Sequence, residues 1–177
     1  MNICVYLGAN EGNNPIYKEG IKELGTWIGK NNHTLVYGGS KVGLMGILAD
    51  SALDVGGKVI GVEPEFFVSA CKQNDNLTKL IVTKDIRERK GKMIELSDAF
   101  IAFPGGTGTL EEIAEIISMV CLNQTDSPCI IYNLNHYYDE FKLFLDKMIQ
   151  EGFSTKEKLK NVLFVENIDQ IKEILSK

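Results

Sequence analysis

A glycine-rich segment at residues 104–112, Pro-Gly-Gly-Thr-Gly-Thr-Leu-Glu-Glu, holds the residues best suited to chemistry. It follows an apolar run, residues 99–103, and precedes apolar residues at helical spacing. Glycines let the backbone approach a phosphate, and the free N–H groups and dipole at a helix start attract the anion. The hydroxyls of Thr107 and Thr109 can add donors. A strand-to-helix turn without a ligand is the alternative, but three glycines and two threonines favour a phosphate site.

Glu112 is the carboxylate that we expect beside this turn. At helical spacing one stripe is apolar, and it comprises Leu110, Ile113, Ile116, Ile117 and Val120. Glu111 and Glu115 fall nearly opposite that stripe, so we expect them in solvent. Glu112 falls at its edge, in the first turn, where a side chain can face a ligand. The alternative is that Glu112 only complements the helix dipole, worth roughly 0.3–1 kcal/mol.

Arg89 is a second charge in an unexpected place. It lies three residues after Ile86 and four before Met93, on the apolar face of a helix expected over residues 85–97. A guanidinium on that face must meet an anion, because an unpaired buried charge is costly. The anion is either a structural carboxylate or a ligand phosphate. A solvated arginine with a buried stem is the alternative. Lys90 borders the same face and is placed to assist.

Apolar runs of strand length alternate with amphipathic helical patterns along the whole chain. The runs expected to form strands are residues 3–7, 34–37, 58–62, 80–83, 99–103, 129–132 and 162–165. Because these runs are apolar throughout, they indicate a parallel sheet covered on both faces. We therefore predict an α/β fold, a doubly wound Rossmann-like, mostly parallel sheet of about seven strands with helices on both faces. Residues 65–78 show no clear strand or helix periodicity and are expected to hold a short helix and a loop.

Three glycine clusters follow expected strands, at Gly8 with Ala9, at Gly38 with Gly39, and at residues 105–108. In doubly wound sheets ligands bind outside the carboxyl ends of the strands, where the strand order reverses. The three clusters should therefore converge on one crevice.

The ligand predicted from these turns carries a single phosphate group. The dinucleotide fingerprint G-x-G-x-x-G does not follow the first expected strand, and the second ends in Gly38-Gly39 instead of an acidic residue. The sequence also contains no P-loop. These features argue against NAD and nucleoside triphosphates and leave a mononucleotide or a sugar phosphate. His33 and His136 stand alone in expected surface loops, so we predict no metal and no cofactor.

Composition sets further limits. A chain of 177 residues with 44% hydrophobic and 24% charged residues suits one globular domain, residues 1–177. The net charge of −5 gives no basic footprint for nucleic acid or an anionic membrane, and no apolar run is long enough to span a bilayer. The sequence shows no signal-peptide pattern. The cysteines lack metal-ligand spacing and are expected to be buried thiols in a reducing cytoplasm: Cys4, Cys71, Cys121 and Cys129.

Residues 89–93 (Arg-Lys-x-x-Met) followed by residues 104–112 resemble the signature of the LOG (Lonely Guy) family. These are cytokinin riboside 5′-monophosphate phosphoribohydrolases, long labelled possible lysine decarboxylases. Residues 37–39, 43–46 and 152–153 are similar to that family as well, so the resemblance covers nearly the whole chain.

The resemblance implies a reaction and a set of site residues. The family's catalytic arginine falls on Arg89, its catalytic glutamate on Glu112, and its phosphate loop on Gly105, Gly106, Thr107, Gly108 and Thr109. Further substrate contacts are expected from Gly8, Ala9, Gly38, Gly39, Lys90 and Met93. The implied reaction hydrolyses the N-glycosidic bond of an adenosine-type nucleoside 5′-monophosphate, AMP or an N6-prenylated AMP, without a metal. The family also implies a homodimer with sites near the subunit interface.

Several positions depart from the family pattern. Ile86 stands where methionine is common, and Asn123 replaces glycine. Aromatic residues are common in the family where this chain has Ile116, Ile117 and Met119. Val62-Glu63-Pro64 replaces a more apolar Val-Ile-Pro. These changes leave the phosphate loop and the catalytic pair in place but concern the base pocket. The departures therefore bear on which base is bound and not on the type of reaction.

Two other functions remain open at this point. One is a non-catalytic binding module, such as the molybdenum cofactor carriers that share this fold. The other is a nucleosidase for different purine or pyrimidine monophosphates. The presence of both Arg89 and Glu112 favours the enzyme.

Overall fold

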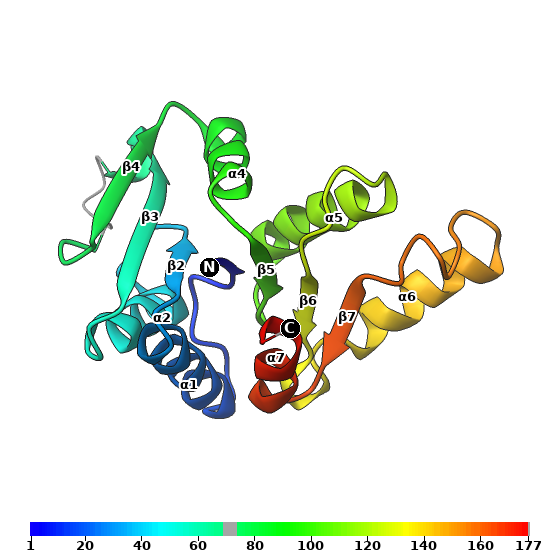
Figure 1. Ribbon diagram of the computed structural model, residues 1–177, viewed down its shortest axis with the longest axis horizontal. Coiled ribbons are helices and arrows are strands. Elements are labelled where there is room, and N and C mark those ends of the chain that lie inside the picture. The colour runs from blue at the N-terminus through cyan, green and yellow to red at the C-terminus, as the bar shows by residue number, and fades with distance from the viewer. Residues whose placement is uncertain (69–73, 177) are drawn as a thin grey trace.

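A parallel β-sheet of seven strands forms the centre of the protein in the computed structural model, which describes residues 1–68 and 74–176 (Figure 1). The strands lie in the order β4-β3-β2-β1-β5-β6-β7, and all neighbouring pairs are parallel. Their bounds are β1 Asn2–Tyr6, β2 Thr34–Tyr37, β3 Lys58–Pro64, β4 Lys79–Thr83, β5 Ala99–Ala102, β6 Cys129–Tyr132 and β7 Val162–Val165. The strand order confirms the predicted doubly wound α/β fold.

Helices cover both faces of the sheet. Their bounds are α1 Ile16–Lys30, α2 Gly43–Leu53, α3 Glu65–Val68, α4 Ile86–Glu95, α5 Thr107–Cys121, α6 Asp139–Gln150 and α7 Ile168–Leu175, with a 3₁₀ turn at Leu134–His136. Helices α1, α2 and α7 pack in one hydrophobic cluster, and α4, α5 and α6 pack in the other. Figure 1 shows these two sets on opposite sides of the strands.

The central strand β1 explains why the strands are apolar throughout. Ile3 and Val5 point into the cluster under α1 and α2, whereas Cys4 and Tyr6 point into the cluster under α4 and α5. Successive side chains of a strand face opposite sides of the sheet, so a strand covered on both faces needs apolar residues at every position. This pattern made the strands predictable from the sequence.

The strand order reverses beside β1. From β1 the chain crosses through α1 to β2 on one side, and β5 pairs with β1 on its other side. The carboxyl ends of β1, β2 and β5 therefore meet where the two halves of the sheet diverge, which is where ligands bind in this architecture.

Helix α5 begins earlier than the sequence predicted. It starts at Thr107, so Thr107 to Thr109 form its first turn and do not belong to a preceding loop. Leu110 was predicted on the buried stripe, but 45% of it is exposed. Within residues 65–78, where a short helix and a loop were predicted, α3 follows β3 directly. Residues 69–73 of the predicted loop lie outside the described residues.

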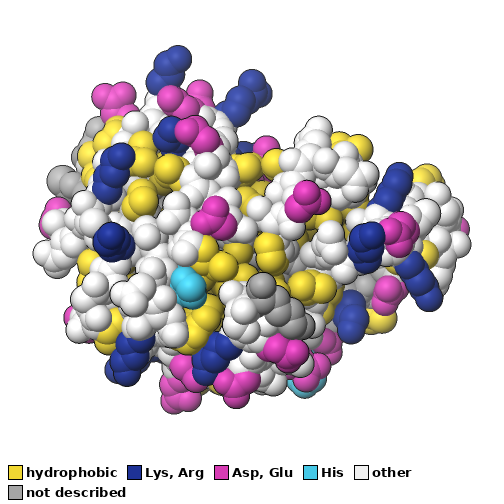
Figure 2. All heavy atoms as spheres, viewed as in Figure 1, with side chains coloured by type: hydrophobic (Ala, Val, Ile, Leu, Met, Phe, Trp, Pro, Cys, Tyr) yellow, Lys and Arg dark blue, Asp and Glu magenta, His cyan; other side chains and the backbone are white. Residues whose placement is uncertain are grey.

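Other features of the described chain bear on the composition arguments. Cys4 and Cys129 are buried free thiols, as predicted, while Cys121 is half-buried and Cys71 lies outside the described residues. Burial raises the pKa of both buried thiols to about 12. Figure 2 shows acidic and basic side chains interspersed over one face of the molecule. None of the described helices is long and apolar enough to cross a membrane.

Candidate active site

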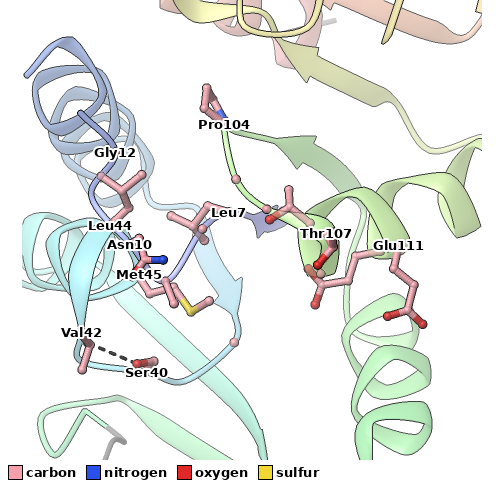
Figure 3. A pocket seen from close by; sticks show the side chains of 18 of the residues that line it. Leu7, Asn10, Gly12, Ser40, Val42, Leu44, Met45, Pro104, Thr107 and Glu111 are labelled. Carbon is pink, nitrogen blue, oxygen red and sulfur yellow. Dashed lines mark hydrogen bonds between the residues drawn. The ribbon is translucent and has the colours of Figure 1, made fainter. Parts of the chain in front are cut away.

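A cavity of about 710 Å³ opens at the carboxyl ends of β1, β2, β3 and β5 (Figure 3). Its walls include Gly8 and Ala9 after β1, Gly38 after β2, and residues 104–109 after β5. The predicted convergence of the glycine clusters on one crevice is therefore confirmed. The size falls within the range of small-molecule sites. In Figure 3, Thr107 of α5 lies across the cavity from Asn10 and Met45.

The first turn of α5 forms one wall of this cavity. Gly106 precedes the helix in an extended conformation, and no side chain caps the helix start. The N–H groups of Thr107, Gly108 and Thr109 therefore lack intrahelical acceptors, and the first intrahelical bond is donated by Leu110 to the Gly106 carbonyl at 3.1 Å. The first turn also contains no acidic residue. These features suit an anion at the positive end of the helix dipole.

Gly105 brings the loops after β1 and β5 into contact. A Cβ atom at this position would lie 2.2 Å from Thr109 Oγ1 and 2.6 Å from the Gly8 nitrogen, so only glycine fits. The Gly8 N–H donates to the Pro104 carbonyl at 3.3 Å. From the other side, the Tyr137 hydroxyl donates to the Gly105 carbonyl at 2.5 Å. The turn that would hold a phosphate is thus fixed before any ligand binds.

Arg89 and Glu112 form an ion pair inside the cavity. The Nη1 atom of Arg89 lies 3.0 Å from Glu112 Oε1, and the side chains are only 11% and 8% exposed. Arg89 Nε also donates to the Val62 carbonyl at 3.0 Å, which fixes the guanidinium against β3. The predicted inward position of both groups is confirmed. Glu112 was expected in the first turn of its helix, but it is the sixth residue of α5 because the helix starts at Thr107.

Gly38 leaves room for this guanidinium. A Cβ atom at Gly38 would lie 2.3 Å from Arg89 Nη2, so a side chain there would displace the arginine. The glycine after β2 therefore serves the ion pair, in addition to lining the cavity.

Burial controls the electrostatics of the pair. Desolvation raises the pKa of the Glu112 carboxyl above its ordinary value, and the Arg89 charge opposes that rise. A buried carboxylate held by one guanidinium keeps strong electrostatic interactions because little water screens it. Glu112 is thus placed to respond to positive charge that develops in the cavity.

Lys90 joins α4 to α5 at the rim of the cavity. Its Nζ atom lies 2.8 Å from Glu111 Oε1 and 3.1 Å from Glu115 Oε2. The hydrogen bond with Glu111 is the main cause that raises the pKa of Lys90. Both glutamates are exposed, as predicted, but they carry an ion-pair partner that the sequence analysis did not foresee. The charge of Lys90 is consequently already balanced.

Most of the predicted site residues line the cavity: Gly8, Ala9, Gly38, Arg89, Lys90, Gly105, Gly106, Thr107, Gly108, Thr109 and Glu112. Two do not. Met93 is fully buried in the hydrophobic cluster under α4, so it packs against the sheet and is not placed to touch a ligand. Gly39, with φ of 86°, does not line the cavity but lies against Glu63.

Tyr137 and Glu63 also line the cavity, although neither was predicted as a site residue. Tyr137 belongs to none of the motifs that the sequence offered, so no signal marked it. Glu63 was noticed only as a departure from a family pattern, yet it is a buried carboxyl in the cavity wall. Among the described residues, no cluster of three His, Cys, Asp or Glu side chains is placed to hold a metal ion.

Comparison with known proteins agrees with this arrangement. The family model described as "Possible lysine decarboxylase" matches residues 45–175. The cytokinin riboside 5′-monophosphate phosphoribohydrolase of Rhodococcoides fascians is 39% identical over 169 residues, which cover 95% of this chain and 85% of that protein. The Arabidopsis thaliana enzyme of the same name, LOG1, is 40% identical over 151 residues, which cover 85% of this chain and 71% of that protein.

Solved structures with the same fold include a molybdenum cofactor binding protein from Rippkaea orientalis. It is 26% identical with a TM-score of 0.74, and the match covers 98% of this chain and 96% of that one. The Moco carrier protein of Chlamydomonas reinhardtii, at 22% identity and a TM-score of 0.72 over 99% of this chain and 97% of that one, shares the fold. Because the family model and these enzyme relatives each match most of its length, the chain belongs to the LOG family, whose model still carries the lysine decarboxylase description.

Proposed function

We propose that this chain hydrolyses the N-glycosidic bond of an adenosine-type nucleoside 5′-monophosphate, AMP or an N6-prenylated AMP. The products are the free base and ribose 5-phosphate. The observation that carries the proposal is the buried Arg89–Glu112 pair, which shares one cavity with the uncapped start of α5. The activity that the names of the enzyme relatives state supports the same reaction.

The start of α5 is the proposed phosphate site. The N–H groups of the first turn and the hydroxyls of Thr107 and Thr109 would bind the phosphate oxygens. Gly8 and Ala9, in the loop after β1 that contacts Gly105, would line the phosphate site on the side opposite α5. The phosphate then supplies binding energy away from the reacting bond, so the unphosphorylated nucleoside should be a poor substrate.

Glu112 is the proposed catalytic carboxylate. Breaking the bond between C1′ and the base nitrogen develops positive charge on the ribose ring, which a nearby carboxylate stabilises. The same carboxylate can orient a water molecule toward C1′. The hydroxyl of that water bonds to C1′, and its proton accompanies the departing base. Glu112 is buried with Arg89 as its ion-pair partner, and little water reaches it, so this stabilisation is weakly screened.

Arg89 is the proposed partner of that carboxylate and of the ribose. Its bonds to Glu112 and to the Val62 carbonyl fix the guanidinium, and its remaining nitrogen lies beside Gly38 in the cavity wall. A guanidinium held in this way can position a nucleotide against the carboxylate without reorganising during the reaction. Lys90 would act at the rim, where it already holds two glutamates.

The test is to incubate the protein with AMP, isopentenyl-AMP, IMP and CMP in the presence of EDTA and to follow free base by chromatography. We expect adenine or isopentenyladenine to accumulate, and EDTA to have no effect. Release from IMP or CMP in preference to AMP would indicate a nucleosidase of different specificity. No base from any nucleotide would contradict hydrolysis and would favour a binding module.

We also propose that the enzyme is a homodimer in the cytoplasm, with no nucleic-acid or membrane partner. The dimer follows from family membership, and a monomer by light scattering at working concentrations would contradict it. The free thiols of Cys4, Cys121 and Cys129 suit a reducing compartment. The net charge of −5 disfavours phosphate backbones and anionic lipids as partners.

A further inference from the structure

Glu63 is a buried carboxyl that the proposed mechanism does not use. It belongs to the carboxyl end of β3, lines the cavity and is only 2% exposed. Its Oε2 atom is fully buried and has no hydrogen-bond partner among the described residues. A buried carboxyl oxygen without a partner is unfavourable, so such groups in native proteins call for an explanation.

The neighbours of Glu63 are engaged elsewhere. The charge of Arg89 acts on Glu63, but Arg89 donates hydrogen bonds to Glu112 and to the Val62 carbonyl. The Tyr37 hydroxyl donates to the Ser40 carbonyl at 3.2 Å. Gly39 lies against Glu63, where a Cβ atom would come within 3.0 Å of the Glu63 Cβ, and it has no side chain that could donate a hydrogen bond. Desolvation raises the pKa of the Glu63 carboxyl, and the Arg89 charge opposes that rise.

Glu63 lies at the end of the cavity away from the proposed phosphate site. Strand β3 lies three strands away from β5, which at the usual spacing is about 14 Å from the phosphate end of the cavity. Arg89 and Glu112 lie between these two ends, because Arg89 contacts both the Val62 carbonyl of β3 and α5. A nucleotide with its phosphate on α5 and its ribose at Glu112 therefore extends its base toward β3.

The surroundings of Glu63 suit a flat heterocycle. Val42, Met45 and Phe67 line the same cavity and provide apolar contact area. Within such a site, one polar group that needs a partner fixes the orientation of the ring. A carboxyl oxygen accepts hydrogen bonds in both its neutral and its ionised form, so its complement on a base is an N–H donor.

We propose that Glu63 determines base specificity by accepting a hydrogen bond from the exocyclic amino group of the base. This inference rests on the proposed function, since it assumes that the cavity holds a nucleotide. An adenine alkylated at N6 keeps one N–H and remains a partner. A base without the amino group leaves Glu63 unpaired, which should lower recognition roughly 10- to 100-fold.

The experiment compares AMP with purine riboside 5′-monophosphate, which differs only by hydrogen in place of the amino group. The ratio of kcat/KM for the two nucleotides is measured in the wild type, Glu63→Gln, Glu63→Leu and Glu140→Leu. The last variant removes an exposed carboxylate of α6 that does not line the cavity. The ratio of Kd values is measured separately by calorimetry in a Glu112→Gln background, where nucleotide should not be consumed.

We expect both ratios to favour AMP at least tenfold in the wild-type and Glu140→Leu forms, and largely to persist in Glu63→Gln, which keeps an acceptor. In Glu63→Leu both ratios should fall close to one, through loss on AMP alone. Unchanged ratios in Glu63→Leu would overturn the inference. Should that variant lose its thermal transition, Glu63→Met supplies the same test with a flexible side chain.

The two measurements separate this inference from the proposed function. Turnover with ratios that Glu63→Leu does not change would leave the hydrolysis standing and remove Glu63 from recognition. Absence of turnover, with a Kd ratio that collapses in Glu63→Leu, would refute the hydrolysis and support the role of Glu63.

Discussion

The Gly38→Ala variant tests the active-site geometry most directly. The added Cβ would lie 2.3 Å from Arg89 Nη2, whereas ordinary contact begins near 3.4 Å, so the guanidinium must move by about 1 Å. Nη2 is the far end of a flexible side chain, so the fold can absorb the movement at small cost. The hydrogen bonds of Arg89 to Glu112 and to the Val62 carbonyl, both 3.0 Å long, cannot both survive it.

The expected consequence is a loss of catalysis with little loss of stability. A misplacement of about 1 Å costs on the order of 100-fold in rate, which corresponds to about 2.7 kcal/mol of transition-state stabilisation. We expect kcat/KM for AMP to fall by that factor, while the free energy of unfolding changes by less than about 1 kcal/mol. Initial rates of base release and urea unfolding curves measure the two quantities.

A matched control comes from the same helix as Arg89. A Cβ at Gly91 of α4 would meet nothing within 4 Å, so Gly91→Ala should leave activity unchanged. It should also raise stability by roughly 0.5–1 kcal/mol, because alanine favours the helix interior over glycine. Near-wild-type activity of Gly38→Ala would refute the argument that Arg89 must hold its observed position. Equal losses of activity in both variants would point to a general disturbance of α4.

Three further predictions follow from the carboxyl groups. Glu112→Gln should lower kcat at least 100-fold while the Kd for AMP changes by less than about fivefold, because the charge acts in the transition state; undiminished turnover would remove Glu112 from the mechanism. Since burial raises the pKa of Glu112 and its ionised form is needed, kcat/KM should fall on acidification, with a midpoint above the ordinary value near 4.3; a midpoint at or below that value would contradict the assignment. Burial also raises the pKa of the Glu63 carboxyl in the folded state above its value in the unfolded chain. The favourable contribution of Glu63 to folding is therefore complete below about pH 4.3, where the carboxyl is protonated in both states, and it is lost as the pH rises through the folded-state pKa. Glu63→Gln should therefore have a higher Tm than the wild type at pH 8 but not at pH 4, and a lower Tm at pH 8 would count against it.

The sequence predicted the strands and singled out Arg89 and Glu112 because each breaks or obeys a simple burial pattern. Strands buried on both faces must be apolar at every position, and charged residues on or beside an apolar helix face are rare enough to stand out. Arg89 and Glu112 were identified in this way, and the structure joins them across two helices at 3.0 Å.

The sequence predicted which face of a helix a residue lies on better than whether the residue lies at the ligand crevice or over the core. Arg89 is the fourth residue of α4 and Met93 the eighth, and they share one face. In a βα unit the helix starts at the carboxyl edge of the sheet, so its first turns face the ligand crevice and later turns cover the core. Periodicity fixes only the face, so it did not show that Leu110, near the start of α5, is exposed. Met93, from which the family resemblance implied a substrate contact, lies on the same face as Arg89 but is buried in the core.

The start of α5 shows why helix boundaries escaped the sequence analysis and what that start contributes. Gly106 precedes the helix without a capping side chain, so the usual Ser, Thr, Asp or Asn signal was missing. The unsatisfied N–H groups that result are the feature that a phosphate would use. They matter more here because Arg89 already shares its charge with Glu112 and Lys90 shares its own with Glu111 and Glu115. A phosphate dianion entering this cavity would thus depend mainly on backbone donors, and an acidic residue in the first turn, where α5 has none, would oppose its binding.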